Sequence, residues 1–206
     1  MDTSYKLNYE NNSSELTKSE SEKDLGVTID ADLDFDTHIN NKINTANKIF
    51  GIIRRAYVNL NPQTFIPLYK AMVRSHLDYA VSVWCPYKEK HIEALEKVQR
   101  RATKRIDGFK NFSYEERLKK LKLPTLKYRR IRGDMIECYK ILNEVYDTNK
   151  KNFFELQIER NEGRILRGHS LKVYYPRFQK NIRKHSFPVH VIETWTRCGD
   201  LNCVNG

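Results

Sequence analysis

The sequence predicts a mainly α-helical fold, with a short β-hairpin or strand at the N-terminus and a small irregular β segment near the C-terminus. Two observations favour helices. Apolar residues recur every three or four positions over several stretches, and capping signals such as Ser113 followed by Glu116 mark helix starts. The 206-residue chain is 39% hydrophobic, toward the low end for a compact protein. We therefore expect one or two domains with modest cores.

Residues 1–24 predict little regular structure. They are rich in Asn, Ser and Glu and offer few apolar side chains, so we expect an edge hairpin at most, or a frayed tail. Residues 25–29 form a short β-branched run between Asp24 and Asp30 and predict a strand, in which Gly26 permits close approach of another backbone. Four aspartates then offer helix-capping groups: Asp30, Asp32, Asp34 and Asp36.

The clearest helix covers residues 38–57, where apolar side chains step by three or four positions throughout. A second helix is predicted to begin with Asn61 as its cap and Pro62 as its first residue. Pro67 should bend this helix early, because proline has no amide proton to donate. Residues 77–84 are expected to extend it.

A third helix has one apolar and one strongly basic face, and it should end near Gly108. Its apolar stripe consists of Ile92, Leu95, Val98, Ala102 and Ile106. Its basic face carries Lys97, Arg100, Arg101, Lys104 and Arg105. Like charges on neighbouring turns destabilise an isolated helix by roughly a few tenths of a kcal/mol per pair. The pattern therefore indicates an anionic ligand, and a phosphate backbone is the natural candidate.

Two more helices are predicted downstream. Ser113 and Glu116 form a capping box for a short fourth helix, and Pro124 with Thr125 begins a long helix that reaches about Tyr146. The predicted core stripe of the long helix is Ile131, Met135, Cys138, Leu142 and Val145. Its first turns carry a second basic cluster, made of Lys127, Arg129, Arg130 and Arg132.

Pattern and charge together divide the chain into three parts. Residues 1–36 form an acidic segment, 37–148 a helical domain and 149–206 a basic C-terminal extension. Within the extension, residues 165–191 alternate basic with aromatic or β-branched side chains, and we interpret them as the irregular β segment. The net charge is +11, although residues 1–36 hold ten acidic and three basic side chains. The strongly cationic remainder is therefore the expected working surface.

Composition excludes several classes of protein. No run approaches the roughly 20 apolar residues of a membrane span, and the polar N-terminal residues lack a secretory hydrophobic segment. We therefore expect an intracellular protein, nuclear or cytoplasmic, without a membrane partner. The four cysteines are too widely spaced for a disulfide framework and are interpreted as ordinary thiols: Cys85, Cys138, Cys198 and Cys203.

Two groups of residues offer metal-donor atoms, and we expect neither to hold a metal. One group is His185, His190, Cys198 and Cys203, whose spacing is looser than in zinc motifs. The other is the aspartate series over 30–36, which helix capping explains. The sequence has no Gly-rich phosphate loop, no nucleophile elbow and no His-Glu zinc helix. The residues alone thus predict a helical nucleic-acid-binding module with no catalytic residue, no cofactor and no small-molecule substrate.

Several ordered strings closely resemble the part of non-LTR retrotransposon reverse transcriptases, of the jockey or CR1 type, that follows the catalytic core. They include EKDLGVTID over 22–30, HLDYA over 76–80, LEKVQRRA over 95–102, SYEERL over 113–118 and GDMI over 133–136. RGHS over 167–170 and Trp195 continue the series. Each string is short, but together they run in order from about residue 5 to 195.

The resemblance implies a fragment of an RNA-directed DNA polymerase. Leu25, Gly26 and Val27 resemble the primer grip at the palm's edge, and the helices after them resemble the thumb that holds the template-primer duplex. The implied phosphate contacts are Lys97, Arg100, Arg101, Lys104 and Arg105, with Lys127, Arg129 and Arg130 as secondary contacts. We assign Tyr79 and Trp84 to packing.

The catalytic aspartate pair of the family, carried on a Tyr-x-Asp-Asp turn, has no counterpart here. Mg²⁺ is therefore expected only for a palm that this chain lacks, and the chain alone is not expected to polymerise. The residues after Trp195 also depart from the family pattern, which a frameshifted or truncated copy would explain. The expected partners are an RNA/DNA or DNA duplex and a separate reverse transcriptase core.

Two alternatives stay open at the level of sequence. The basic faces would also suit a helical protein-interaction module that meets acidic partners and has no nucleic-acid role. The chain would also fit a full reverse transcriptase whose gene model has lost its upstream part. Binding that survives nuclease treatment favours the first alternative, and an upstream Tyr-x-Asp-Asp coding run favours the second.

Overall fold

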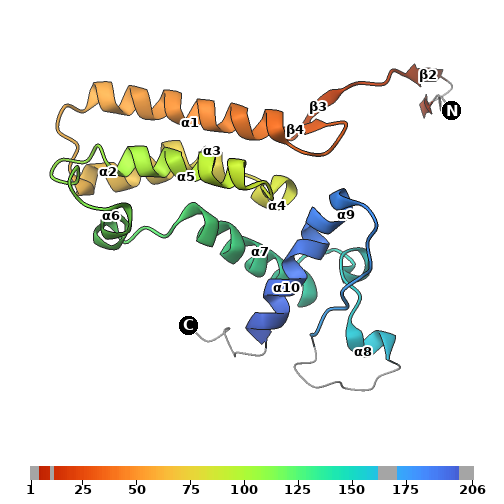
Figure 1. Ribbon diagram of the computed structural model, residues 1–206. Helices are drawn as coiled ribbons and strands as arrows, with labels where there is room; N and C mark the ends of the chain where they lie inside the picture. Colours follow the sequence, from red (N-terminus) through yellow and green to blue (C-terminus); the bar gives the residue numbers. More distant parts are fainter. Residues whose placement is uncertain (1–4, 10–11, 162–170, 200–206) are drawn as a thin grey trace.

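The computed structural model describes residues 5–9, 12–161 and 171–199, and it is mainly α-helical, as predicted (Figure 1). Four strands come first: β1 (Tyr5–Tyr9), β2 (Asn12–Leu16), β3 (Ser21–Asp24) and β4 (Val27–Asp30). The longer helices are α1 (Asp36–Ala56), α5 (Glu89–Thr103), α7 (Leu126–Leu142) and α10 (Phe187–Gly199). Shorter helices are α2 (Pro62–Leu68), the π-helical turn η1 (Tyr69–Arg74), α3 (Ser75–Asp78), α4 (Val81–Trp84), α6 (Tyr114–Leu121), the 3₁₀ turn η2 (Lys150–Asn152), α8 (Gln157–Arg160) and α9 (Asn181–His185). No helix in these described ranges combines the length and apolar character needed to cross a bilayer.

The strands form two antiparallel hairpins, β1 with β2 and β3 with β4. In the second hairpin Asp24 pairs with Val27, so Leu25 and Gly26 form a two-residue turn. Both turn residues have positive φ, 43° and 82° respectively, as a type I′ turn requires. The prediction of one continuous strand over 25–29 is therefore wrong in its first two residues.

Helix α1 confirms the clearest helical pattern, beginning two residues earlier than predicted. It buries Ile39, Ala46 and Ile53 against η1, α3 and α5. Asn61 caps α2 as predicted, because its Oδ1 accepts from the amide of Thr64 at 2.9 Å.

The helix after Asn61 does not run on to Trp84 as a regular helix. The chain passes from α2, which contains Pro67, into the wider π-helical turn η1, a place where the regular hydrogen-bond ladder is interrupted. It leaves helical geometry at Tyr79 and at Ala80, whose φ is 52°. Trp84 is buried, and its indole Nε1 donates to the Tyr79 carbonyl at 2.8 Å.

The capping box before α6 is confirmed. The Ser113 hydroxyl accepts from the amide of Glu116 at 3.3 Å, and Glu116 Oε2 accepts from the amide of Ser113 at 2.7 Å. Thr125 caps α7 by a single bond, since its hydroxyl oxygen accepts from the amide of Tyr128 at 3.1 Å.

The predicted core stripe of α7 needs correction. The helix ends at Leu142, and Ile131 and Val145 are 41% and 61% exposed. The buried positions of α7 are Leu126, Arg130, Asp134, Cys138, Ile141 and Leu142. Since Arg130 and Asp134 are charged, a search for apolar periodicity selects the neighbouring positions instead.

Two hydrophobic cores meet within α7. The first is formed by β4 and the helices up to Leu126, and the second by Cys138–Leu142 together with Phe154, Val173 and α10. The predicted boundary at 148 lies after α7, whereas the cores change over in the middle of this helix.

The predicted β segment over 165–191 is only partly β-like. Residues 165–170 lie outside the described part of the chain. Val173 forms a single antiparallel bridge with Leu156, but the part of the segment after residue 180 lies in the helices α9 and α10, apart from Ser186 between them. Phe187, Val191 and Trp195 are spaced four apart and pack into the second core, which is helical periodicity that the alternation of basic residues concealed.

Candidate nucleic-acid interface

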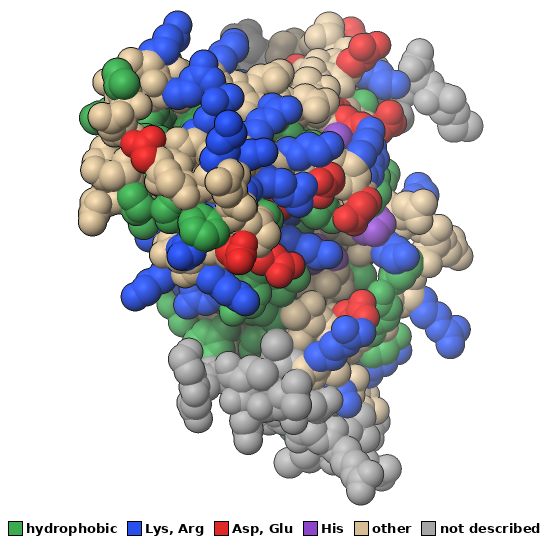
Figure 2. Space-filling view, turned by 60° about the vertical axis from the view of Figure 1, so that its left-hand side comes forward, with side chains coloured by type: hydrophobic (Ala, Val, Ile, Leu, Met, Phe, Trp, Pro, Cys, Tyr) green, Lys and Arg blue, Asp and Glu red, His purple; other side chains and the backbone are tan. Residues whose placement is uncertain are grey.

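A basic hollow lies between the C-terminal halves of α1 and α5 and has a volume of about 570 Å³. The name refers to its eight lining residues, Asn47, Phe50, Gly51, Arg54, Arg101, Lys104, Arg105 and Lys110. Both helices end on the left of Figure 1. That side comes forward in Figure 2, where Lys and Arg side chains gather over the upper part of the face.

The packing of α1 on α5 creates the hollow. Ile53 of α1 and Ala102 of α5 are buried in the first core. Arg54 and Arg101 are the neighbours of these two core residues, and both are exposed. Gly51 leaves open space beside them, because a Cβ added there would meet no atom within 4 Å.

The five cations of the hollow have no acidic counterpart. No carboxylate lines the hollow. Among the residues the structure describes, Arg54, Arg101, Lys104, Arg105 and Lys110 form no ion pair, and all five are exposed. A concave surface that carries like charges in this way favours a polyanion.

The structure brings together three of the five predicted phosphate contacts on α5. Arg101, Lys104 and Arg105 all line the hollow, whereas Lys97 is exposed but lies outside it. Arg100 is half-buried and engaged elsewhere. Its guanidinium donates to Glu93 at 2.7 Å and lies 5.0 Å from the centre of the Tyr114 ring.

The second predicted cluster is divided: Lys127 and Arg132 are exposed, whereas Arg129 and Arg130 are not free at the surface. Lys127 is exposed, but Arg129 forms an ion pair of 2.9 Å with Asp78. Arg130 is only 4% exposed, and two of its guanidinium nitrogens have no hydrogen-bond partner. Arg130 therefore belongs to the interior of the protein.

The residues that resemble a primer grip lie at the other end of α1, a helix roughly 30 Å long (Figure 1). Leu25 is 84% exposed at the hairpin tip, whereas Val27 is buried. The Leu25 carbonyl accepts from the Tyr79 hydroxyl at 2.8 Å. Tyr79 is half-exposed and holds this turn through its hydroxyl group, whereas Trp84 is buried in the core.

The prediction that the aspartates over 30–36 cap α1 is wrong, because the N-cap residue is Phe35 and no side chain caps the helix. Cations instead hold two of the aspartates, Asp34 and Asp36. Asp34 Oδ1 accepts from the amide of Asp36 at 3.0 Å, and Lys88 donates to both carboxylates at 2.9 and 2.7 Å. Lys90 and His91 complete the shell of Asp36. The hydrogen bond from the Asp36 amide and that from Lys88 lower the pKa of Asp34.

The four residues considered for zinc are not brought together where they are described. His185 stacks on Tyr87, with ring centres 4.0 Å apart. His190 instead contacts Asp134 at 3.1 Å. The side chain of Cys198 and the whole of Cys203 lie outside the described part of the chain.

Sequence reasoning missed Arg54 and Lys110, which complete the hollow from other segments. A weak signal existed for Arg54, because it lies in the last turn of α1 next to Arg55. Chemically, the hollow offers five positive charges and no nucleophile or acid–base pair, so its geometry suits binding of phosphate groups. Comparison with models of known protein families, with curated proteins and with solved structures finds no match.

Proposed function

We propose that this chain is the thumb-like part of a retrotransposon reverse transcriptase, which holds an RNA/DNA or DNA duplex without reading its sequence and does not polymerise alone. The observation that carries the binding proposal is the basic hollow, with its five exposed cations and no lining carboxylate. The resemblance of the ordered strings supports the assignment to reverse transcriptases.

The hollow supports contact with phosphates more than with bases. Its charges are Lys and Arg side chains at the ends of two helices, and their positions would track a backbone and fix its register. If all five contact phosphates, log K should fall against log salt concentration with a slope of roughly −4 to −5 for duplex DNA. Sequence preference should be weak.

A simpler explanation is that the basic residues only neutralise the partial negative charge at the C-terminal ends of α1 and α5. The C-terminus of a helix carries about half a negative charge, so two helix ends account for about one cation. The hollow holds five. The excess makes a ligand the better explanation.

The test measures duplex binding across a salt series. In the triple variant R101A/K104A/R105A we expect weaker binding and a slope reduced to roughly −2, since three contacts are lost. The matched control is K180A/R183A/K184A, which removes the same charge from exposed residues around α9, outside the hollow. Equal weakening in both variants would show that net charge alone governs binding, and unchanged binding in the first would refute the interface.

The second half of the proposal concerns chemistry. Purified chain supplied with template-primer, Mg²⁺ and deoxynucleotides should bind the duplex but incorporate no nucleotide. Incorporation that persists through purification and disappears with the triple variant would overturn it. Capture of protein partners that survives nuclease, without measurable duplex binding, would instead support a protein-interaction module.

A further inference from the structure

We propose that Cys85, Asp134 and His190 form a Zn²⁺ site that joins the two cores. The three residues come from three separate elements. Cys85 follows α4, Asp134 lies in the middle of α7 and His190 lies in α10. One donor atom from each lies within 4.8 Å of the others.

Two of the three donor distances are close to those of a tetrahedral ion, and the third lies within 4.8 Å. Ligand distances of about 2.0–2.3 Å place the donor atoms of a tetrahedral zinc site roughly 3.3–3.8 Å apart. Asp134 Oδ2 lies 3.1 Å from His190 Nε2 and 3.8 Å from Cys85 Sγ. Small shifts of these side chains would centre an ion between them, and thiolate, imidazole and carboxylate are all zinc ligands.

The Asp134 carboxylate supplies an independent observation. Its side chain is only 4% exposed, and its Oδ1 atom has no hydrogen-bond partner. An unpaired carboxylate oxygen in the interior is costly. A bound cation would compensate that cost, because it attracts both oxygens of the group.

The charges balance when the ion is present. Zn²⁺ with one thiolate, one carboxylate and a neutral imidazole carries no net charge, so the buried site gains none. The positive charge of Arg130 interacts electrostatically with Cys85 and Asp134. It also interacts with the carboxylates of Asp78 and Glu96. Arg130 therefore has acidic neighbours besides Asp134.

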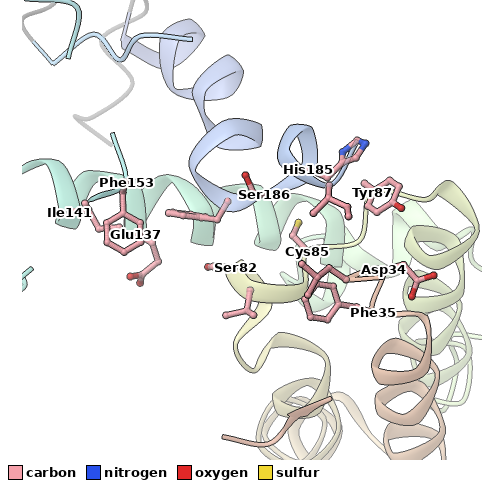
Figure 3. Close-up of a pocket in the computed structure, with 14 residues that line it drawn as sticks. Asp34, Phe35, Ser82, Cys85, Tyr87, Glu137, Ile141, Phe153, His185 and Ser186 are labelled. Atoms are coloured by element: carbon pink, nitrogen blue, oxygen red, sulfur yellow. The ribbon is translucent and has the colours of Figure 1, made fainter. Parts of the chain in front are cut away.

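One of the three ligands, Cys85, borders a cavity, whereas Asp134 and His190 do not line it. Cys85 lines a cavity of about 450 Å³ between the two cores, together with residues such as Phe35, Tyr87 and Ser186 (Figure 3). Three protein ligands leave a fourth position for water, as in open zinc sites.

The competing account is a pair between His190 and Asp134 with no metal. Burial alone would lower the pKa of His190, but its hydrogen bonds to Asp134 and Cys85 outweigh burial and raise that pKa to about 10. The ring would then be a cation held by the carboxylate. Metal binding distinguishes a Zn²⁺ site from a metal-free pair of His190 with Asp134, so the test measures metal binding directly.

The experiment titrates the reduced, chelator-treated full chain with Zn²⁺ against a chromophoric chelator, and with Co²⁺ by absorption spectroscopy. We expect one equivalent of metal, a tetrahedral Co²⁺ spectrum with a thiolate charge-transfer band, and a higher melting temperature with Zn²⁺. C85S, D134N and H190Q should each weaken binding by more than about 100-fold, beyond the 10- to 100-fold typical of residues that only support ligands.

Matched controls are C138A, H185Q and C198S, which should bind as the wild type does. Cys138 is a buried thiol on α7, and His185 lies in α9, close to His190 in sequence. A wild-type chain that binds no stoichiometric metal would overturn the proposal. So would a Co²⁺ complex without a thiolate band, or binding that is lost in H185Q and C198S but kept in C85S. The wild-type titration tests the proposal even if one of the variants does not fold. Its result does not depend on whether the protein binds a duplex.

Discussion

The Tyr69 hydroxyl donates a 2.7 Å hydrogen bond to Gln99 Oε1 in the interior of the first core, where Gln99 is fully buried. The Gln99 amide donates in turn to the Tyr114 hydroxyl and to the Pro124 carbonyl, at 3.0 and 2.9 Å. One side chain of α5 thus connects η1, α6 and the start of α7. This network fixes the orientation of the helix whose opposite face supplies Arg101 to the basic hollow.

Replacing Gln99 with Leu should destabilise the protein by about 2–4 kcal/mol, because the Tyr69 and Tyr114 hydroxyls and the Pro124 carbonyl lose a buried partner. Urea denaturation followed by circular dichroism measures the change. The control is Gln63→Leu, the same substitution at an exposed position of α2, for which we expect less than about 0.5 kcal/mol. Similar losses in both variants would contradict the role of the network.

The buried network also shows where sequence reasoning fails for the fold. The helix over 38–57 was predictable because its buried positions, apart from His38, are apolar and evenly spaced. Gln99, Arg130 and Asp134 are equally buried, but polar. Their partners lie in other elements, and apolar periodicity carries no information about such tertiary contacts.

The basic hollow could be predicted from the sequence only where its residues lie on one helix. Arg101, Lys104 and Arg105 lie on neighbouring turns of one helix, so their common face follows from helical geometry. Arg54 and Lys110 join them only through the packing of α1 on α5. The sequence likewise could not reveal that Arg130, a predicted contact, is buried.

His38 should make stability depend on pH between about 6.5 and 4. Its Nδ1 accepts from the amide of Thr28 at 3.0 Å, so the folded ring is neutral. Burial, with a contribution from Lys42, lowers its pKa to about 4, whereas the unfolded value is about 6.5. The unfolded state therefore binds a proton first, and stability falls by about 3 kcal/mol as the pH drops through this window.

The measurement compares urea denaturation of the wild type and His38→Gln at pH 7 and at pH 4. The variant should lose some stability at pH 7, because the ring packs against Trp84, but it should lose less than the wild type on acidification. His76→Gln is the control, because it removes a histidine that lies in α3 and outside the contacts of His38 with Thr28 and Trp84. Parallel pH curves for wild type and His38→Gln would exclude this assignment.

Asp36 should make the stability of the protein depend on pH below about 4. Burial alone would raise its pKa, but hydrogen bonds from Lys88, Lys90 and His91 outweigh burial and hold the pKa of this carboxyl well below its usual range. Its contribution is therefore present above the unfolded value of about 3.9 and is lost as the pH falls further. Asp36→Asn should cost about 1 kcal/mol at pH 7, since the site is partly exposed.

That cost should shrink as the pH falls below about 4, which thermal melts at several pH values would detect. Asp32→Asn is a matched control, because Asp32 is exposed and forms no ion pair in the described ranges. A deficit of Asp36→Asn that stays constant down to pH 2 would show that the charge of Asp36 does not contribute.

The hairpin turn offers a stabilising substitution. Leu25 is exposed and has a φ of 43°, a region where Asn is tolerated far better than Leu. Leu25→Asn should therefore stabilise the protein by about 1 kcal/mol. Leu16→Asn applies the same change to an exposed leucine of a strand and should give no gain. A lower melting temperature for Leu25→Asn than for the wild type would contradict the turn assignment.

Gly51 permits a test of the basic hollow that removes none of its cations. The residue lines the hollow, and a side chain there meets open space. Gly51→Ala should stabilise α1 by up to about 1 kcal/mol, because alanine is the better helix former, and it should leave duplex binding nearly unchanged. Gly51→Glu keeps most of the helical gain but places a carboxylate among five cations.

If phosphates occupy the hollow, Gly51→Glu should weaken duplex binding about 10-fold or more at low salt, because the new carboxylate pairs with the arginines and repels the ligand. The difference from Gly51→Ala should narrow as salt rises, since screening weakens both effects. Fluorescence anisotropy with a mixed-sequence duplex measures both variants. Because Gly51→Glu keeps all five cations and is expected to fold at least as well as the wild type, weak binding would be attributable to the hollow itself. Equal binding by the alanine and glutamate variants at low salt would place the duplex elsewhere on the protein.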